Sequence, residues 1–292
     1  MAQFRTLTRL SYPPTTLPIV KPGVYEALLT ARLQQELSAS TNLVHDLKNV
    51  DEADQPLAIT RHLSVLIEQA LKAARTPEAR VAIARDILSV LPDPDALGEA
   101  LYREGSDRIK RLDAVMPAGV VDMSRYVRPE TPFSDTALMT NARDEPTLAA
   151  ELRAELASAD HVDLLCAFVK WQGVRLLENE LSALKDRGVK LRVITTTYLG
   201  ATDARALDAL VNEFGADVRI NYEINRTRLH AKAWMLGRHT GLDTAYVGSS
   251  NLSHAALVEG LEWNVRLSSV STPHLLEKFR ATFESYWENR EF

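Results

Sequence analysis

The chain has 292 residues, of which 46% are hydrophobic and 25% are charged, and its formal net charge is −5. This composition is typical of a folded protein with about two domains, and it excludes disordered, collagen-like and low-complexity chains. A slightly acidic chain is not expected to coat nucleic acid indiscriminately, but its charge balance leaves room for a local basic cleft.

The amino terminus predicts neither export nor membrane insertion. Residues 1–10 lack the continuous apolar run of a secretory signal, and no stretch approaches the roughly 20 apolar residues that span a bilayer. A single cysteine, Cys166, excludes an intrachain disulfide and a cysteine-based zinc site, and its apolar surroundings predict a buried, inert thiol. We therefore expect a soluble, cytoplasmic protein without a membrane partner.

The first hundred residues predict helices and carry no recognisable chemistry. Apolar side chains recur at helical spacing, and Thr76-Pro77 and Asp93-Pro94 each combine an N-cap with proline at the first helical position. The expected helices are 22–38, 57–75, one that starts at 77, and one that starts at 94 and ends near 104. We interpret residues 1–104 as a helical domain whose Leu and Ala stripes form a core rather than a docking surface.

Residues 105–144 lose regular patterning, but they are apolar enough to predict an ordered connector instead of a flexible linker. From residue 145 onward, runs of β-branched and apolar residues alternate with helical patterns. The expected strands are 161–169, 190–198, 216–224, 229–236, 244–249 and 262–268, and the expected helices are 145–158, 173–187, 204–214 and 273–289. This order predicts an α/β domain over 145–292, with a mixed sheet between helical layers.

The segment that carries chemistry contains His230, Lys232, Ser249, Asn251 and Glu262. Side chains two apart on a strand point to the same face, so His230 and Lys232 are expected to project together. The set suits phosphodiester chemistry, because a neutral imidazole can attack phosphorus while Lys232 and Asn251 donate to the non-bridging oxygens. Glu262 is expected to hold a ring N–H of His230 and thereby fix its tautomer.

These residues resemble the HKD motif of the phospholipase D superfamily, which reads His-x-Lys, an Asp, Gly-Ser-x-Asn and then a Glu. His230-Ala231-Lys232, Gly248-Ser249-Ser250-Asn251 and Glu262 match the motif residue by residue. The Asp of the motif falls on Gly237, and Asp243 lies in what reads as an inserted turn. The sequence therefore departs from the family at this one position.

Over residues 130–292, the sequence is also similar to HKD nuclease domains attached to bacterial superfamily II DNA helicases. The resemblance implies a phospholipase D-like α/β/α fold for 145–292 and a metal-independent DNA nuclease without a cofactor. It also implies two histidines per site, one that forms a phosphohistidine and one that protonates the leaving group. Because this chain has one His-x-Lys and no helicase P-loop, the resemblance implies a homodimer with a shared site and a helicase that is a partner or is fused elsewhere.

Two pairs of residues are candidates for binding the substrate, and each has a structural alternative. Lys170 and Trp171 follow a strand, where they can bind phosphate and stack on a base, or pack under the next helix. Thr196 and Thr197 lie where a strand turns toward a helix, and such a turn either binds phosphate or is an ordinary capped turn.

A basic stretch surrounds the His-x-Lys segment. Arg226 and Arg228, with Arg219 and Arg238, give residues 219–238 a local excess of positive charge. This excess either attracts DNA phosphates or belongs to a solvated strand edge.

The sequence is compatible with three functions. The first is the DNA nuclease, with single-stranded or double-stranded DNA as its partner. The second is a nucleic-acid-binding module whose site no longer turns over. The third, a phospholipid-acting phosphodiesterase, is disfavoured because the chain shows neither a second motif nor an amphipathic membrane helix.

Overall fold

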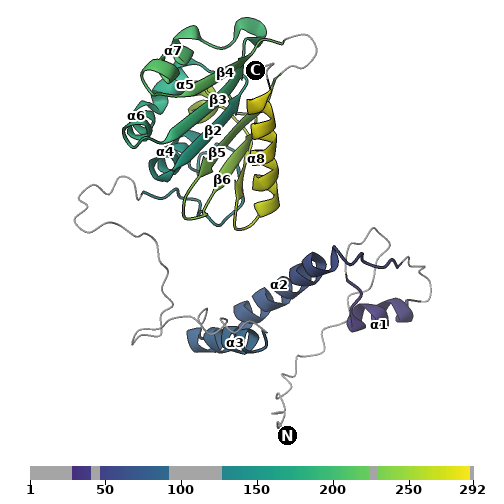
Figure 1. Cartoon of the computed structure of the whole chain (residues 1–292). Coiled ribbons are helices and arrows are strands. Elements are labelled where there is room, and N and C mark those ends of the chain that lie inside the picture. Colours follow the sequence, from purple (N-terminus) through teal and green to yellow (C-terminus); the bar gives the residue numbers. More distant parts are fainter. Residues whose placement is uncertain (1–27, 41–46, 92–126, 224–228, 290–292) are drawn as a thin grey trace. The chain divides into compact units, whose positions relative to one another are not determined.

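The computed structural model describes residues 28–40, 47–91, 127–223 and 229–289. The chain divides into two compact units, residues 1–113 and 114–292. The first unit contains helices α1 (Ala31–Ala39), α2 (Gln55–Ala73) and α3 (Pro77–Ser89) (Figure 1). The helix expected from residue 94 to about 104 lies outside the described residues.

Two of the three described helices of the first unit start at a capping threonine. Thr76 accepts the N–H of Ala79 at 3.2 Å on its hydroxyl, and Pro77 is the first residue of α3, so the predicted N-cap with a following proline is confirmed. Thr30 caps α1 in the same way, through the N–H of Leu33 at 3.2 Å. Helix α1 therefore begins at Ala31, and residues 22–27 of the helix predicted over 22–38 lie outside the described residues.

The second unit contains a seven-stranded mixed sheet with the strand order β1-β7-β6-β5-β2-β3-β4. Strands β2, β3 and β4 are parallel, and the pairs β2–β5, β5–β6, β6–β7 and β7–β1 are antiparallel. The strands are β1 (Ala137–Met139), β2 (His161–Cys166), β3 (Lys190–Thr196), β4 (Asp217–Asn221), β5 (Lys232–Gly237), β6 (Thr244–Gly248) and β7 (Asn264–Ser268). The predicted α/β class with a mixed sheet is confirmed.

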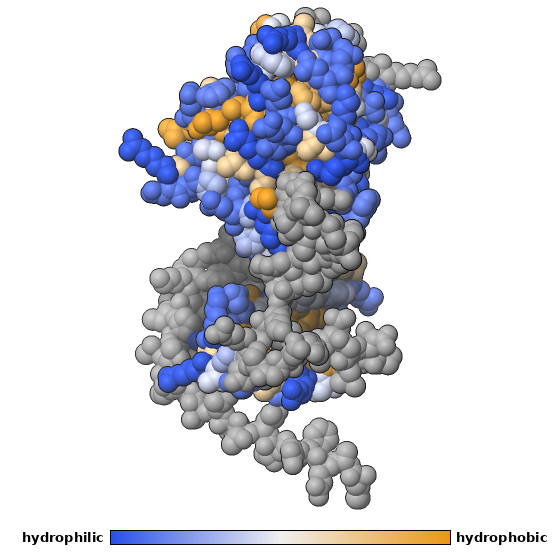
Figure 2. All heavy atoms as spheres, turned by 90° about the vertical axis from the view of Figure 1, so that its left-hand side faces the viewer, coloured by the Kyte–Doolittle hydropathy of each residue, from blue (hydrophilic) through white to orange (hydrophobic). Residues whose placement is uncertain are grey.

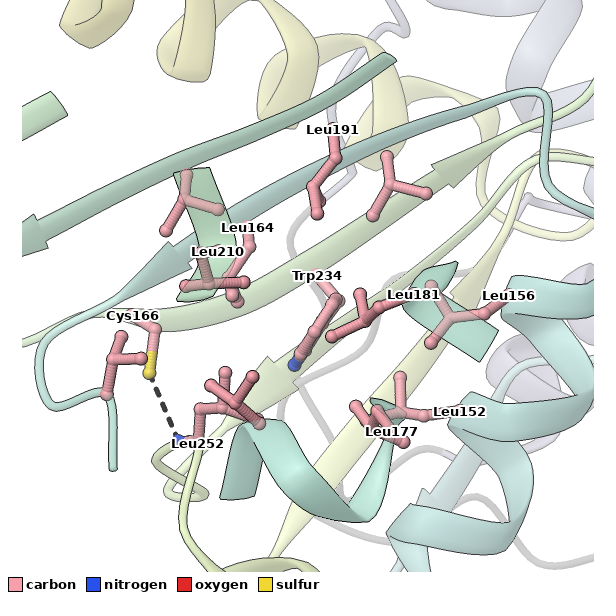
Figure 3. Close-up of a cluster of buried hydrophobic side chains, with 14 of the residues drawn as sticks. Leu152, Leu156, Leu164, Cys166, Leu177, Leu181, Leu191, Leu210, Trp234 and Leu252 are labelled. Atoms are coloured by element: carbon pink, nitrogen blue, oxygen red, sulfur yellow. Dashed lines mark hydrogen bonds between the residues drawn. The ribbon is translucent and has the colours of Figure 1, made fainter. Parts of the chain in front are cut away.

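Helices cover both faces of this sheet. Figure 1 shows α4 to α7 on one face and α8 on the other. The helices are α4 (Leu148–Ser158), α5 (Trp171–Leu176), α6 (Glu178–Asp186), α7 (Ala204–Asn212) and α8 (Pro273–Glu288), with short turns η2 (Tyr198–Gly200) and the π-helix η3 (Ala255–Glu259). The larger core lies under α4 to α7 and contains Leu152, Leu164, Leu181 and Trp234 (Figure 3).

The smaller core lies on the α8 face, where Leu165, Ile194 and Ala233 of the sheet meet Phe283 of the helix. On the face of the unit that Figure 2 shows, hydrophilic side chains predominate and hydrophobic ones show between them. Across the described ranges, none of the helices combines the length and the apolar character needed to cross a bilayer.

Several expected elements differ in their bounds. The helix predicted over 173–187 is two helices that break at Leu177. This buried residue donates its N–H to the carbonyl oxygen of Val174, three residues back, instead of four residues back as in an α-helix. The strand predicted from residue 229 begins at Lys232, and the strand predicted from 262 begins at Asn264. Within the expected connector, residues 137–139 form β1 and pair with β7, so part of that segment belongs to the sheet.

Candidate active site

The site lies where the carboxyl ends of the parallel strands β2, β3 and β4 meet, which we call the catalytic edge of the sheet. At this edge the antiparallel strands β5 and β7 begin and β6 ends. Cys166, the last residue of β2, pairs with Lys232, the first residue of β5. Gly248, the last residue of β6, pairs with Asn264, the first residue of β7. The segments that carry His230, Ser249, Asn251 and Glu262 therefore leave the sheet at the same edge.

His230 and Lys232 are in direct contact. The Lys232 ammonium Nζ lies 3.0 Å from Nδ1 and 3.1 Å from Nε2 of the His230 ring, and it donates to the His230 carbonyl oxygen at 2.7 Å. The Lys232 ammonium therefore lies within hydrogen-bond distance of both ring nitrogens. His230 precedes β5 instead of lying on it, and its imidazole is exposed, which leaves the ring accessible to substrate.

Lys232 is a buried cation with an aromatic neighbour. Its side chain is 7% exposed, and this burial lowers the pKa of the ammonium, an effect that the negative charge of Glu262 partly offsets. The ammonium lies 5.9 Å from the centre of the Phe168 ring, and the same ring meets the His230 imidazole edge-to-face at 5.8 Å. Phe168 thus supports both members of the His-x-Lys pair.

Ser249 and Glu262 form a second pair at this edge. The Ser249 hydroxyl donates a short hydrogen bond to the Glu262 carboxylate and accepts the N–H of Trp263 at 3.1 Å. Among the described residues of this single chain, no hydrogen bond joins Glu262 and the His230 ring, and the role of Glu262 in orienting this ring stays a prediction. Glu262 is half-buried and precedes β7, and its carboxylate accepts the Ser249 hydroxyl.

Asn251 is positioned by a clamp between two loops. Its Oδ1 accepts the N–H of Phe168 at 3.2 Å, and its amide N–H groups have no hydrogen-bond partner among the described residues. The next residue, Leu252, donates its N–H to Cys166 Sγ at 3.2 Å (Figure 3), and its carbonyl accepts the N–H of Lys170 at 2.8 Å. The Asn251 amide is therefore fixed in place with its donors available.

Cys166 supports this clamp from below the site. The side chain is fully buried, and burial raises the pKa of the thiol to about 11. The predicted buried, inert thiol is confirmed, and its sulfur has the structural task of accepting the Leu252 N–H.

Lys170 and Trp171 both contact nearby residues of the same chain. Lys170 Nζ is 3.1 Å from Asp203 Oδ1, and the Trp171 N–H donates to Asp203 Oδ2 at 2.9 Å. The Arg205 guanidinium lies 4.2 Å from the centre of the Trp171 ring. Trp171 is half-buried. Part of its side chain therefore packs against the protein, as one expectation had it, and part stays exposed for the stacking that the other expectation gave it.

The Thr196–Thr197 pair and the basic stretch 219–238 lie only partly at the site. Thr196 is fully buried and its hydroxyl accepts the N–H of Tyr198 at 3.1 Å, so Thr196 shapes the turn, whereas Thr197 is exposed. Arg226 and Arg228 lie outside the described residues. The phosphate role predicted for the whole basic stretch does not extend to its two ends.

Arg219 and Arg238, at the two ends of the basic stretch, pack against residues outside the candidate site. The Arg219 guanidinium lies 4.4 Å from the centre of the Trp287 ring of α8, and Arg238 is buried in an ion pair with Glu155. Asp243, the residue near the missing Asp of the motif, accepts the N–H of Arg238 at 2.7 Å and binds Arg280 at 2.8 Å. Asp243 thus organises the β5–β6 turn at the other edge of the sheet.

Two contributors to the site have no motif in the sequence. Phe168 contacts His230, Lys232 and Asn251, and the available signal was its place at the end of a strand. Asn141 reaches the segment before Glu262 from more than a hundred positions away. In the part of the chain that the structure describes, no cluster of three or more His, Cys, Asp or Glu side chains forms a metal-binding group.

Comparisons with known proteins give one family match and several similar solved structures. Residues 152–287 match a family described as "Cardiolipin synthase, PLD-like domain". No curated protein matches the sequence. Among solved structures, NucT from Helicobacter pylori is 12% identical with a TM-score of 0.39, and the alignment covers 52% of this chain and 96% of that one.

Two further solved structures are similar to the chain. Nuc from Salmonella typhimurium, a phospholipase D family member, is 20% identical with a TM-score of 0.37, over 52% of this chain and 95% of that one. Yeast tyrosyl-DNA phosphodiesterase is 11% identical with a TM-score of 0.31, over 45% of this chain and 31% of that one. The family match over residues 152–287, on a mixed sheet between two helical layers, gives this part of the chain the phospholipase D-like fold.

Proposed function

We propose that the chain is a metal-independent phosphodiesterase that cleaves DNA through a covalent phosphohistidine. The observation that carries the proposal is the exposed His230 imidazole, whose ring nitrogens lie 3.0 and 3.1 Å from the Lys232 ammonium. A neutral imidazole is a nucleophile, and a cation beside it can hold the phosphate that it attacks.

The chemistry divides into two steps. A ring nitrogen of His230 attacks phosphorus, and the bond from phosphorus to the leaving oxygen breaks as a second imidazolium gives that oxygen a proton. The second imidazole then takes a proton from water, which attacks phosphorus and breaks the bond to His230. Lys232 and the free amide N–H groups of Asn251 donate to the non-bridging oxygens in both steps.

The second imidazole in this proposal is His230 of the partner subunit in a homodimer. A row of cross-strand neighbours on the α8 face supports an interface beside the site. Its members, in order across six strands, are Ile194, Leu165, Ala233, Val247, Val265 and Leu138. Residues of the first three positions pack with α8, but Val247, Val265 and Leu138 are 42%, 39% and 50% exposed.

This uncovered half of the row is continuous with the site. Trp263, which is 64% exposed, follows Glu262 and binds the Ser249 hydroxyl through its N–H. Burying these apolar side chains against a second copy removes them from water and brings two catalytic edges together. The helicase link of the proposal, in repair, restriction or defence, rests on the sequence resemblance alone.

Cleavage of plasmid and oligonucleotide DNA in the presence of EDTA tests the function. We expect cleavage by the wild type, loss to background in His230→Ala, and wild-type rates in His239→Ala, which removes an exposed histidine from the β5–β6 turn. A labelled oligonucleotide should also form an alkali-stable, acid-labile adduct with the wild type but not with His230→Ala.

Other results would point away from this function. DNA binding without cleavage that is equal in the wild type and His230→Ala would indicate an inactive binding module. Release of head groups from phospholipid vesicles, without cleavage of DNA, would indicate a lipid-acting enzyme.

A further inference from the structure

Asn141 has an unusual backbone conformation for a residue other than glycine. It follows β1 with φ +54°, in the left-handed region, where asparagine is better tolerated than most residues. Its side chain uses both ends of the amide. Oδ1 accepts the N–H of Leu148, the first residue of α4, at 3.0 Å, and Nδ2 lies 3.2 Å from the carbonyl oxygens of both Ala256 and Gly260.

Ala256 lies within the π-helix η3 and Gly260 directly follows it, and η3 lies between Asn251 and Glu262 in the chain. A π-helix is rare and is often found at functional sites. Leu261, between Gly260 and Glu262, is 87% exposed, so packing does little to fix the end of this segment. The Gly260 carbonyl also accepts the N–H of Glu262 at 2.9 Å, so the atom that Asn141 holds is bonded directly to the backbone of Glu262.

The start of the segment is connected to the same point. Ala256 O, the other carbonyl that Asn141 holds, also accepts the Ser250 hydroxyl at 3.4 Å. Ser250 lies between Ser249 and Asn251, and its oxygen accepts an N–H of the Asn264 side chain at 2.8 Å. One amide therefore links the start of α4 to both arms of the loop that carries Ser249, Asn251 and Glu262.

We propose that Asn141 is a positioning residue that sets the Ser249–Glu262 pair relative to Asn251, which rests on the proposed function of that site. The role needs two donors and one acceptor on a short side chain, together with a positive φ. Aspartate keeps the acceptor for Leu148 but sets a carboxylate oxygen against two carbonyls, and glycine keeps the backbone but loses all three bonds.

Three variants test the proposal in the full chain, with bis(p-nitrophenyl) phosphate and labelled oligonucleotide as substrates. We expect Asn141→Gly to lower kcat about 10- to 100-fold while KM changes less than about 2-fold. Asn141→Asp should be as impaired at neutral pH, and its kcat relative to wild type should rise as pH falls toward about 4, where the protonated carboxyl can donate. Asn212→Ala, which removes an exposed amide bonded only within α7, should leave both constants unchanged.

Hydrogen exchange separates this proposal from the proposed function. In Asn141→Gly, the amides of residues 255–262 should exchange at least 10-fold faster than in wild type, while those of β3 keep their protection. If the wild type cleaves no phosphodiester but the exchange changes as stated, the function fails and the positioning role stands. Unchanged exchange in residues 255–262 overturns the positioning role, whatever the activity of the variant.

Discussion

At the scale of single residues, Lys232 has two tasks in the proposed reaction. In this structure its ammonium holds the His230 ring and backbone, and in the reaction it binds the non-bridging oxygens of the phosphate. Burial lowers the pKa of this ammonium, so it loses its proton at a lower pH than an ordinary lysine does. A neutral amine stabilises the charge on phosphate poorly, and activity should fall as Lys232 deprotonates.

Replacing Lys232 with arginine tests this pH dependence. We expect wild-type kcat/KM to decline on the alkaline side before the ordinary lysine value of about 10.4, and Lys232→Arg to lack this decline because a guanidinium stays charged. The variant should be about 10-fold slower at pH 7, since a planar fork fits the lysine site imperfectly. Lys185→Arg, an exposed change on α6, is the control, and the same alkaline decline in all three proteins would show that Lys232 does not cause it.

At the scale of elements, α5 packs directly on the loop that carries Asn251. A Cβ on Gly173 would lie 2.4 Å from both the carbonyl carbon and the oxygen of Leu252, and 2.6 Å from the nitrogen of Ser253. These are backbone atoms, so a side chain at this position cannot be accommodated by a rotamer change.

We therefore expect Gly173→Ala to push the helix and the loop apart. The free energy of unfolding should fall by about 1–3 kcal/mol, and kcat should fall because Asn251 moves away from Phe168. Denaturant unfolding and steady-state kinetics measure both effects. Gln172→Ala, at the neighbouring exposed position, should change neither, and a fully active Gly173→Ala would mean that the clamp tolerates a shift.

The helix α8 is held to the other face by a buried cation. Arg192 donates to Asp163 at 2.7 and 2.8 Å and to Glu284 of α8 at 2.8 and 2.9 Å, and it stacks on Phe283. Burial by itself raises the pKa of Asp163, but the hydrogen bonds from His161 and Arg192 outweigh it and hold this pKa below its ordinary value.

A lowered carboxyl pKa stabilises the folded protein above the ordinary Asp pKa, and the contribution is lost as pH falls through the lowered value. At pH 7, Arg192→Met should lower the free energy of unfolding by about 3–5 kcal/mol, because Asp163 is left charged, buried and short of partners. The difference from wild type should shrink as pH falls toward 3. Urea unfolding at several pH values measures it, with Arg175→Met as an exposed control, and a constant difference would contradict the assignment to Asp163.

At the scale of the whole molecule, the proposed reaction needs a second imidazole that a single chain does not carry in its His-x-Lys motif. The apolar residues left uncovered beyond α8 lie beside the catalytic edge, so the proposed interface and the proposed site are continuous. Assembly and activity should therefore be lost together.

Val265→Asp places a charge in the middle of this uncovered row. We expect its solution mass, measured by light scattering, to be half that of the wild type, and its cleavage of DNA to fall to near background. Val211→Asp, on the exposed side of α7, should keep the wild-type mass and rate. A wild type that is a strict monomer at all concentrations and still cleaves DNA would contradict a site shared between two copies.

Local patterns in the sequence predicted the type and order of most described elements in the second unit, but not strand β1 or the break between α5 and α6. Period-two and period-3.6 patterns are local, and so are the capping residues, as Thr76 shows at the start of α3. The spacing of the motif residues was sufficient to predict one candidate site, because neighbouring strands of a sheet end close together. These residues are His230, Lys232, Ser249, Asn251 and Glu262.

Which of these residues touch one another depends on how distant segments of the chain pack. Glu262 binds Ser249, Arg238 is buried on Glu155, and Asn141 reaches a loop 115 positions away. Such contacts depend on strand register and on the path of loops between strands, which no local pattern encodes. The residue types at the site were therefore readable from the chain, whereas their hydrogen-bond partners were set by how distant segments pack.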